Sequence, residues 1–279
     1  MTDSLPPTST LERDLVTRVI VSISSDIGTA LALHWLEEGY KVVGTYRTWT
    51  QACDSLVSSG AILYQCDLSD AKSIKDCGVR ILSHGDWDIL TIAAGTLEPV
   101  GAFADVSFDA WSSSLEINLL AQLRFLHLLL PRRNRTSRLG PLVLFFAGGG
   151  TNSAPLNYSA YTLSKVALIK ACELLHAEIL DTRFSILGPG WVKTKIHDQT
   201  LNAGKLAGAN FEKTRNMLQG GDWQSMEGIL ACCDWIAASP REIIGGRNFS
   251  SQYDAWGTTE LSQALEQDDN MYKLRRSGN

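Results

Sequence analysis

Short apolar runs alternate with longer segments whose apolar residues recur every three or four positions along the 279 residues of this chain. A short apolar run bounded by turn residues predicts a buried strand, and such runs lie at about 18–22, 41–46, 61–65, 88–93, 142–146, 183–187 and 246–250. The longer periodic segments predict helices at about 27–38, 50–58, 71–83, 111–130, 158–180 and 226–237. Apolar strands that alternate with helices favour an α/β fold, a doubly wound parallel β-sheet with helices on both faces.

Two segments fall outside this alternation. Residues 1–15 carry Asp, Ser, Pro and Thr without an apolar stretch, which predicts a disordered leader and no targeting peptide. Residues at about 195–225 show neither pattern, and we expect them to form an irregular lid over the site. No repeat or linker divides the remainder, so the sequence predicts a single domain over 16–279.

Composition narrows the class of protein. With 44% hydrophobic and 20% charged residues the chain is typical of globular proteins, and a net charge of −5 argues against a nucleic-acid partner. The basic run at 132–138 predicts a solvated loop. The most apolar helix, at 115–130, is too short and too polar to span a membrane, so we expect a soluble, cytoplasmic protein. Six cysteines without Cys-x-x-Cys spacing favour buried thiols in a reducing compartment over a metal site or disulfides.

The pair Tyr161 and Lys165 is the strongest candidate for chemistry. Four residues apart on a predicted helix, the two side chains lie on one face. A phenol has an ordinary pKa of about 10, and a neighbouring ammonium lowers that pKa and makes the tyrosine usable as a general acid or base. The helix follows a predicted strand and the flexible loop 148–150, which is where α/β enzymes place catalytic groups.

The turn after the first strand is a candidate phosphate-binding turn. A Rossmann-like fold places a glycine-rich loop here, and only Gly28 remains of the usual three glycines, with Ser22 and Asp26 at the other two positions. Asp26 brings a negative charge close to the expected pyrophosphate, although an Asp at a helix start also stabilises the helix.

The end of the second strand indicates which dinucleotide is bound. An acid at this point binds the ribose hydroxyls of NAD, whereas an arginine accommodates the 2′-phosphate of NADP. Arg47 stands here and favours NADP(H) over NAD(H).

Together these features resemble the short-chain dehydrogenase/reductase family in its one-domain form, over about 17–249. Besides Tyr161 and Lys165, the resemblance rests on the 24–28 turn, on 66–68, on 93–95, on 117–119 and on the Pro-Gly turn 188–194. It implies that the dinucleotide contacts Ser22, Ser24, Ser25, Asp26, Ile27, Gly28, Arg47, Asp67, Leu68, Ala94, Gly95, Lys165, Pro189, Gly190, Val192 and Thr194.

The resemblance also implies a mechanism. Tyr161 would protonate a carbonyl oxygen as hydride arrives, and Lys165 would bind the nicotinamide ribose. Asn118 would hold a water that links the lysine to solvent through a local break in its helix. The family's serine would fall at 147–148, which carries no hydroxyl. Thr151 is our first candidate for the replacement donor because it follows the glycines, with Asn152 and Ser153 as the others.

Three readings of the function stay open. The first is an NADP(H)-dependent oxidoreductase acting on a carbonyl or alcohol of a small, polar substrate. The second is a dinucleotide-binding sensor or inactive subunit, which the altered phosphate turn and the missing serine favour. The third is a dehydratase or epimerase on the same scaffold. The family resemblance implies a homodimer or homotetramer. Trp191, Trp223 and Trp256 could form aromatic walls of the pocket, with polar contacts from 197–199.

Overall fold

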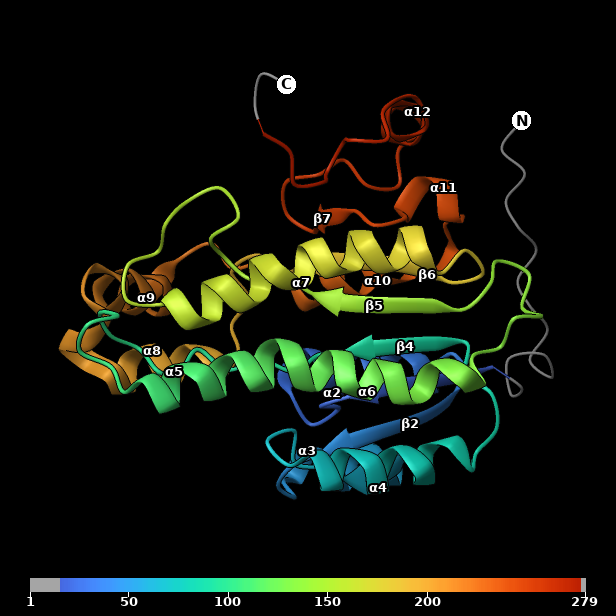
Figure 1. The fold of residues 1–279 in the computed structure, drawn as a ribbon, viewed down its shortest axis with the longest axis horizontal. Coiled ribbons are helices and arrows are strands. Elements are labelled where there is room, and N and C mark those ends of the chain that lie inside the picture. The colour runs from blue at the N-terminus through green and yellow to red at the C-terminus, as the bar shows by residue number, and fades with distance from the viewer. Residues whose placement is uncertain (1–15, 277–279) are drawn as a thin grey trace.

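The computed structural model describes residues 16–276, so the leader predicted at 1–15 lies outside the described residues. Its centre is a seven-stranded sheet in the order β3-β2-β1-β4-β5-β6-β7, in which every neighbouring pair is parallel (Figure 1). The strands are β1 (Thr17–Val21), β2 (Lys41–Tyr46), β3 (Ile62–Gln65), β4 (Ile89–Ile92), β5 (Leu142–Phe146), β6 (Arg183–Gly188) and β7 (Asn248–Ser250). The Rossmann-like doubly wound sheet predicted from the sequence is confirmed.

Helices cover both faces of this sheet. One apolar cluster joins it to α4 (Ala71–Leu82), α6 (Ala121–Leu129) and α7 (Ser159–Glu178), with α5 (Phe108–Leu115) beside α7 on the face that Figure 1 turns to the viewer. A second cluster joins the other face to α2 (Asp26–Glu37), α3 (Gln51–Ser58), α10 (Met226–Ala238), α11 (Arg241–Ile244) and α12 (Thr259–Gln267). Because both faces are buried, the central strands are continuous apolar runs, which is why the sequence shows them so clearly.

Two predicted elements differ from the structure, and two helices near the C-terminus were not predicted. The helix expected at 111–130 begins earlier, at Phe108, and a π-helical segment (η1, Glu116–Leu120) interrupts it between α5 and α6. The excursion expected to be irregular at 195–225 is largely helical, with α8 (Ile196–Ala203), η3 (Gly204–Ala207) and α9 (Ala209–Gly220). These helices carry few apolar residues, so no apolar stripe marks them in the sequence. Helices α11 and α12 were not expected at all.

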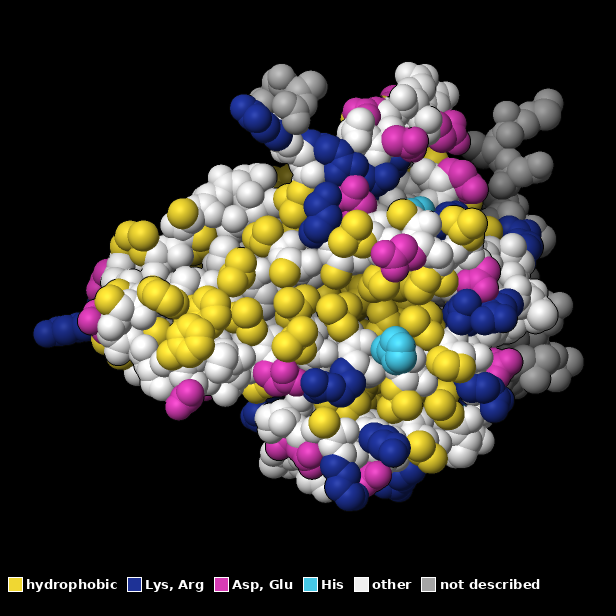
Figure 2. All heavy atoms as spheres, viewed as in Figure 1, with side chains coloured by type: hydrophobic (Ala, Val, Ile, Leu, Met, Phe, Trp, Pro, Cys, Tyr) yellow, Lys and Arg dark blue, Asp and Glu magenta, His cyan; other side chains and the backbone are white. Residues whose placement is uncertain are grey.

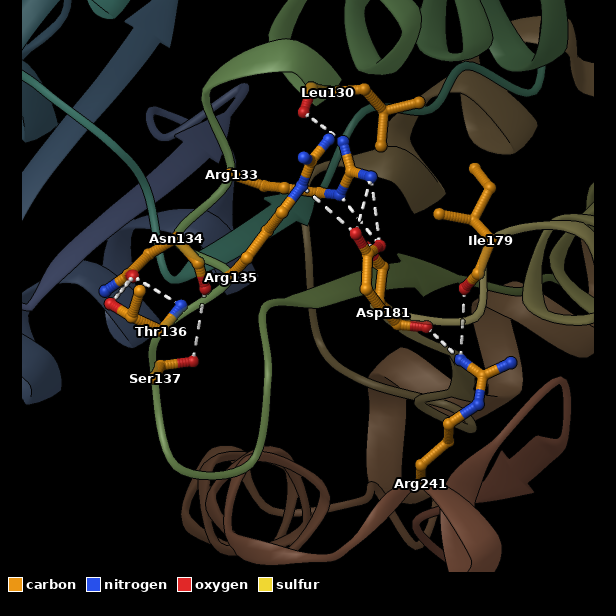
Figure 3. A network of polar contacts seen from close by, with 10 residues as sticks. Leu130, Arg133, Asn134, Arg135, Thr136, Ser137, Ile179, Asp181 and Arg241 are labelled. Atoms are coloured by element: carbon orange, nitrogen blue, oxygen red, sulfur yellow. Dashed lines mark hydrogen bonds and ion pairs between the residues drawn. The ribbon is translucent and has the colours of Figure 1, made fainter.

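The basic run at 132–138 is not simply a solvated loop. After the short η2 turn (Leu130–Arg132), Arg133 donates two hydrogen bonds of 2.9 Å from one nitrogen to both carboxylate oxygens of Asp181, and Arg135 pairs with the same carboxylate at 3.0 Å (Figure 3). Asp181 lies between α7 and β6. These ion pairs therefore connect the segment before β5 to the segment before β6. This end of the sheet is opposite the carboxyl ends of the strands, and we read the cluster as structural.

The order of the strands places the site. β1 pairs with β2 on one side and with β4 on the other, so the chain reverses its winding direction at the carboxyl end of β1. In doubly wound sheets a crevice opens at that reversal point, and ligands bind there. Among the described residues, no helix is both long and apolar enough to cross a bilayer.

Candidate active site and nucleotide cleft

A cavity of about 1680 Å³ lies along the carboxyl ends of the strands. Ligand pockets commonly hold about 300–1,000 Å³, so this cavity has room for a dinucleotide and a second molecule. Of the residues predicted to contact the dinucleotide, all but Gly28 line it, and so do Tyr161 and Thr151. Asn118 is fully buried behind the wall. The tertiary structure therefore brings together residues that the sequence spreads over more than 170 positions.

The phosphate turn keeps its backbone shape without its usual glycines. Ser22 has a φ of 63°, in the left-handed region where the first glycine of such a turn normally lies. Gly28 is required by close packing, because a Cβ there would lie 2.6 Å from the Ser22 carbonyl oxygen. The Ser25 hydroxyl caps α2 by accepting a hydrogen bond from the Gly28 amide at 3.1 Å. The turn thus presents a helix N-terminus to the cavity, as anion binding requires.

Asp26 is the unusual residue of this turn. Its carboxylate accepts a hydrogen bond of 2.7 Å from the backbone amide of Lys195, which lies 169 positions away at the start of α8. The bond connects the phosphate turn to the segment that follows the Pro-Gly turn. The residues of the turn fit a dinucleotide in backbone shape, while the Asp26 charge opposes its pyrophosphate.

The far end of the cleft carries the residues expected around the adenosine. Arg47 is exposed on the cavity wall just past β2, and it has no ion pair to a described residue. The Asp67 carboxylate accepts hydrogen bonds from the Ser69 hydroxyl and amide, and these bonds lower its pKa, with a smaller contribution from Arg47. Arg47 is therefore available to a phosphate, and Asp67 stays ionised beside it.

The catalytic pair lies in the cavity wall, but the expected activation of the phenol is absent. Lys165 is 3% exposed, and its ammonium donates to the carbonyl oxygens of Phe146 (2.8 Å) and Ala94 (3.3 Å). Burial lowers the pKa of Lys165 to about 8 and raises the pKa of Tyr161 to about 12. The prediction of a lowered tyrosine pKa is wrong for this state, because the ammonium lies 5.9 Å from the ring centroid and bonds to backbone carbonyls.

Gly148 occupies the position where the family's serine was expected, and the Tyr161 ring fills the space that a side chain would need. A Cβ at Gly148 would lie 2.4 Å from the Tyr161 hydroxyl oxygen and 2.7 Å from two ring carbons. No real Cβ approaches another atom so closely. The present position of the Tyr161 phenol therefore requires glycine at 148. Thr151, the predicted replacement donor, lines the same cavity and is half-buried.

Asn118 supports the site from behind. Its side-chain oxygen accepts from the Thr96 amide (2.9 Å), and its nitrogen donates to the Thr96 carbonyl (2.9 Å) and the Ser114 hydroxyl (3.1 Å). The π-helical segment that contains Asn118 provides the local break the resemblance implied, and it turns this amide toward the end of β4. A Cβ at Gly95 would lie 3.8 Å from both Asn118 Oδ1 and Lys165 Nζ, so the two polar groups flank one glycine.

The loop after β6 closes the cavity through contacts that the sequence did not reveal. The Gln199 side chain accepts from the Leu97 amide at 2.6 Å and so links α8 to the loop after β4. The Trp191 ring stacks on His197 at 5.2 Å, and Trp223 packs edge-on against both rings. Trp191 lines the cavity, but Trp223 and Trp256 do not, so these two are not pocket walls. Both contribute instead to packing.

The cysteines form no disulfide among the described residues. All six cysteines are buried free thiols. Between residues 16 and 276, no group of three or more His, Cys, Asp or Glu side chains is arranged to hold a metal ion.

Comparison with known proteins agrees with this geometry. The sequence model of the family described as enoyl-(acyl carrier protein) reductase matches residues 21–242. Human dehydrogenase/reductase SDR family member 4 is 26% identical over 188 residues, which cover 63% of this chain and 66% of that protein. The NADPH-dependent 1-acyldihydroxyacetone phosphate reductase of Schizosaccharomyces pombe is 27% identical over 185 residues, covering 63% of this chain and 59% of that protein. The match thus spans less than two thirds of either relative.

Solved structures share the fold at low identity. A short-chain dehydrogenase/reductase from Saccharomyces cerevisiae superposes with a TM-score of 0.75 at 20% identity, covering 87% of this chain and 98% of the yeast chain. An actinorhodin polyketide ketoreductase solved with NADPH gives a TM-score of 0.73 at 18% identity, covering 84% and 95%. At these identities the likeness concerns the arrangement of the backbone.

Proposed function

The chain belongs to the short-chain dehydrogenase/reductase family, and from this premise we propose that it is an NADP(H)-dependent oxidoreductase acting on a carbonyl or alcohol of a small, polar substrate. The observation that carries the proposal is that Tyr161 and Lys165 line the same cavity as the phosphate turn. Arg47 supports NADP(H), because its guanidinium stands unpaired where the 2′-phosphate would lie.

The residues around the cavity have distinct roles in this proposal. The α2 N-terminus and Ser24 would hold the pyrophosphate, Asp67 and Leu68 would contact adenine, and the 189–194 turn would contact the nicotinamide end. When bound, the nicotinamide supplies or accepts the hydride. Helices α8 and α9 would act as the lid over 195–225, within a single domain formed by 16–279.

Tyr161 would hold the proton that the substrate oxygen takes up. An alkoxide is a stronger base than a phenolate, so transfer is favourable even from a phenol whose pKa is raised to about 12. Lys165, with a pKa of about 8, is charged at pH 7 and would stabilise the phenolate that forms. Asn118 would keep the end of β4 in place through Thr96, with its proposed water contact as an additional role.

The donor that replaces the serine is proposed to be Thr151, with Asn152 and Ser153 as neighbours on the same loop. One preorganised donor to a developing oxyanion is worth about 3–4 kcal/mol. Replacing Thr151 by valine should therefore lower kcat about 100-fold or more without changing NADPH affinity. If a Ser153 variant shows this loss of kcat instead, Ser153 is the donor.

Binding without turnover is the second candidate function, and the Asp26–Lys195 bond favours it because it places a charge against the pyrophosphate. Tyr161→Phe separates the two candidates. We expect NADPH-dependent reduction of a panel of small ketones and aldehydes by the native protein, and loss of turnover with unchanged NADPH affinity in the variant. Saturable NADPH binding with no turnover of any carbonyl by the native protein would support the sensor.

Self-association through α5–α7 completes the proposal. Hydrophobic side chains gather over these helices in Figure 2, and Phe108, Leu120, Leu163 and Leu174 are between 48% and 64% exposed. A homodimer or homotetramer would cover them. Leu163→Glu combined with Leu174→Glu should shift the protein to monomer in sedimentation velocity, and a native protein that is already monomeric would refute the interface.

A further inference from the structure

The C-terminal segment 268–276 forms a wall of the catalytic cavity. Tyr272, Lys273, Leu274 and Arg275 line the same space as Tyr161. Ile169 also lines the cavity, and it lies eight residues beyond Tyr161 on α7, which corresponds to about 12 Å along the helix axis. We call the part of the cavity lined by Ile169 and these tail residues the tail branch. The cavity therefore extends from the reacting centre toward the tail.

The tail is fixed in this position by several contacts. The Tyr272 carbonyl accepts from the Asn248 amide at 2.9 Å, which adds the segment to the outer edge of β7. Arg275 donates to both carboxylate oxygens of Glu173 on α7, at 2.7 and 3.1 Å. The Tyr272 ring packs edge-on against Phe249 at 5.5 Å. These contacts give the wall a defined geometry.

The backbone at Tyr272 is strained. Its φ of 61° lies in the left-handed region, which costs a bulky residue on the order of 1–3 kcal/mol. This conformation sits immediately before Lys273, and it persists because the contacts on both sides fix the chain. Strain of this kind concentrates where a side chain must be aimed in a particular direction.

Two cations of this segment, Lys273 and Arg275, line the cavity, and of these two Lys273 has no partner among the described residues. Arg275 is engaged by Glu173, and Glu173 also accepts from Lys170 at 2.7 Å. Lys273 makes no ion pair and no side-chain hydrogen bond within 16–276, although it is half-buried. Burial and the nearby Arg247 lower the pKa of Lys273, and they outweigh the attraction of Asp269 and Glu173. Asp269 and Glu173 therefore attract the Lys273 ammonium without forming an ion pair with it.

The carboxylate that contacts the tail through Tyr272 does not supply a partner charge either. Asp254 also lines the branch, but its carboxylate accepts from the Ser250 amide at 2.7 Å, and Tyr272 donates its hydroxyl to it. Burial raises the pKa of Asp254. Its hydrogen bonds are thus made within the wall, which leaves Lys273 as the unpaired group.

We propose that this branch of the cavity is a subsite for an anionic oxygen group, a carboxylate or a phosphate monoester, at the end of the substrate remote from the reacting carbonyl, with Lys273 as its counter-ion. The inference rests on the proposed function for the reacting end. An unpaired, half-buried cation is stabilised by an anion that shares its site, and an ammonium serves either oxygen group as a point charge. The 12 Å estimate predicts a chain of about eight to ten bonds between the two groups.

Matched substrate pairs test the subsite. We compare kcat/KM for keto acids with kcat/KM for their methyl esters. The acids form a series of increasing chain length, each with its ketone next to the terminal methyl group. In the native protein the acid should be preferred about 10- to 100-fold near the predicted length, the range expected of one charge-assisted hydrogen bond. Lys273→Met should abolish the preference and leave the esters unchanged, and Lys273→Arg should retain it. Keto phosphates against the free keto alcohols distinguish the two anions.

Arg276→Met is the matched control, because it removes an exposed cation of the same segment at a residue that does not line the cavity. Calorimetric binding of the acid and ester, with and without NADPH, gives a readout that needs no turnover. If the protein turns over no substrate but still binds the acid more tightly than the ester, and this preference depends on Lys273, the oxidoreductase proposal fails and the subsite proposal stands. Equal binding of acid and ester by the native protein, or a preference that survives Lys273→Met, would overturn the subsite.

Discussion

The Asp26 carboxylate and the Lys195 amide meet at 2.7 Å across the nucleotide end of the cavity. The contact joins the first turn of α2 to the first residue of the lid, so one side chain holds the two walls of the cleft together. A pyrophosphate at the α2 N-terminus must accommodate this charge or displace it. Cofactor binding and lid position are therefore coupled through Asp26.

Replacing Asp26 by glycine should tighten NADPH binding about 10-fold. At 5 Å and an effective dielectric constant near 20, one unit charge opposes another by about 3 kcal/mol, and solvent screening reduces this. Quenching of tryptophan fluorescence, with Trp191 in the cavity wall as a reporter, measures the dissociation constant. Asp26→Asn is the control, since it removes the charge and keeps an acceptor for Lys195. Unchanged affinity in both variants would contradict the coupling.

Restoring the family's serine should not restore activity. Gly148→Ser would place a Cβ 2.4 Å from the Tyr161 hydroxyl, so the phenol must move away from its present position. We expect kcat to fall at least 10-fold and the melting temperature to fall as well. Gly149→Ser serves as the control, because a Cβ at 149 meets no atom within 4 Å. A Gly148→Ser protein with increased kcat would show that the tyrosine is free to shift at little cost.

Arg47→Ala should change the choice of dinucleotide. Losing a charge-assisted contact to the 2′-phosphate costs about 1.5–3 kcal/mol, so NADPH affinity should fall about 10- to 100-fold. NADH carries no such phosphate, and its affinity should stay the same. Titrations of both dinucleotides against the native protein and the variant test this. An equal loss of affinity for NADH and NADPH would show that Arg47 does not determine which dinucleotide is bound.

The buried lysine should give stability a characteristic pH dependence. Lys165 has a pKa of about 8 in the fold against 10.5 for the free side chain, so the unfolded state binds more protons between these values. The contribution of Lys165 to the free energy of unfolding should therefore rise with pH, by about 2 kcal/mol from pH 8 to pH 10. Below pH 8 both states are protonated, and the unfavourable burial of the charge is fully present.

Lys165→Met removes this dependence. In denaturant titrations at pH 7, 8, 9 and 10, the free energy of unfolding of the native protein should therefore increase relative to that of the variant as pH rises. Taking the difference between the two proteins cancels the titration of other groups, apart from any change in Tyr161. The variant should also lose turnover. A stability difference that stays constant across this range would mean that burial does not lower the pKa of Lys165, so that the lysine stays charged in the folded state throughout the range.

The strength of each sequence signal explains which elements were predicted. β2 and β5 were placed residue for residue, because strands buried on both faces are continuous apolar runs. The helices at 196–203 and 209–220 were missed because they carry few apolar residues, and their stability comes from contacts such as Gln199 with Leu97. The π-helical break was expected only through the family resemblance, since hydrophobic periodicity does not register one inserted residue.

The sequence by itself determined the parallel sheet and the residues that would meet at its carboxyl edge, because strand burial and turn chemistry are local properties. Only the tertiary structure decided three further points: that Asp26 reaches Lys195, that the Tyr161 ring takes the space over Gly148, and that Lys273 enters the cavity unpaired. These relationships join residues up to 169 positions apart or depend on a few ångströms of side-chain placement, and neither is encoded in any local pattern.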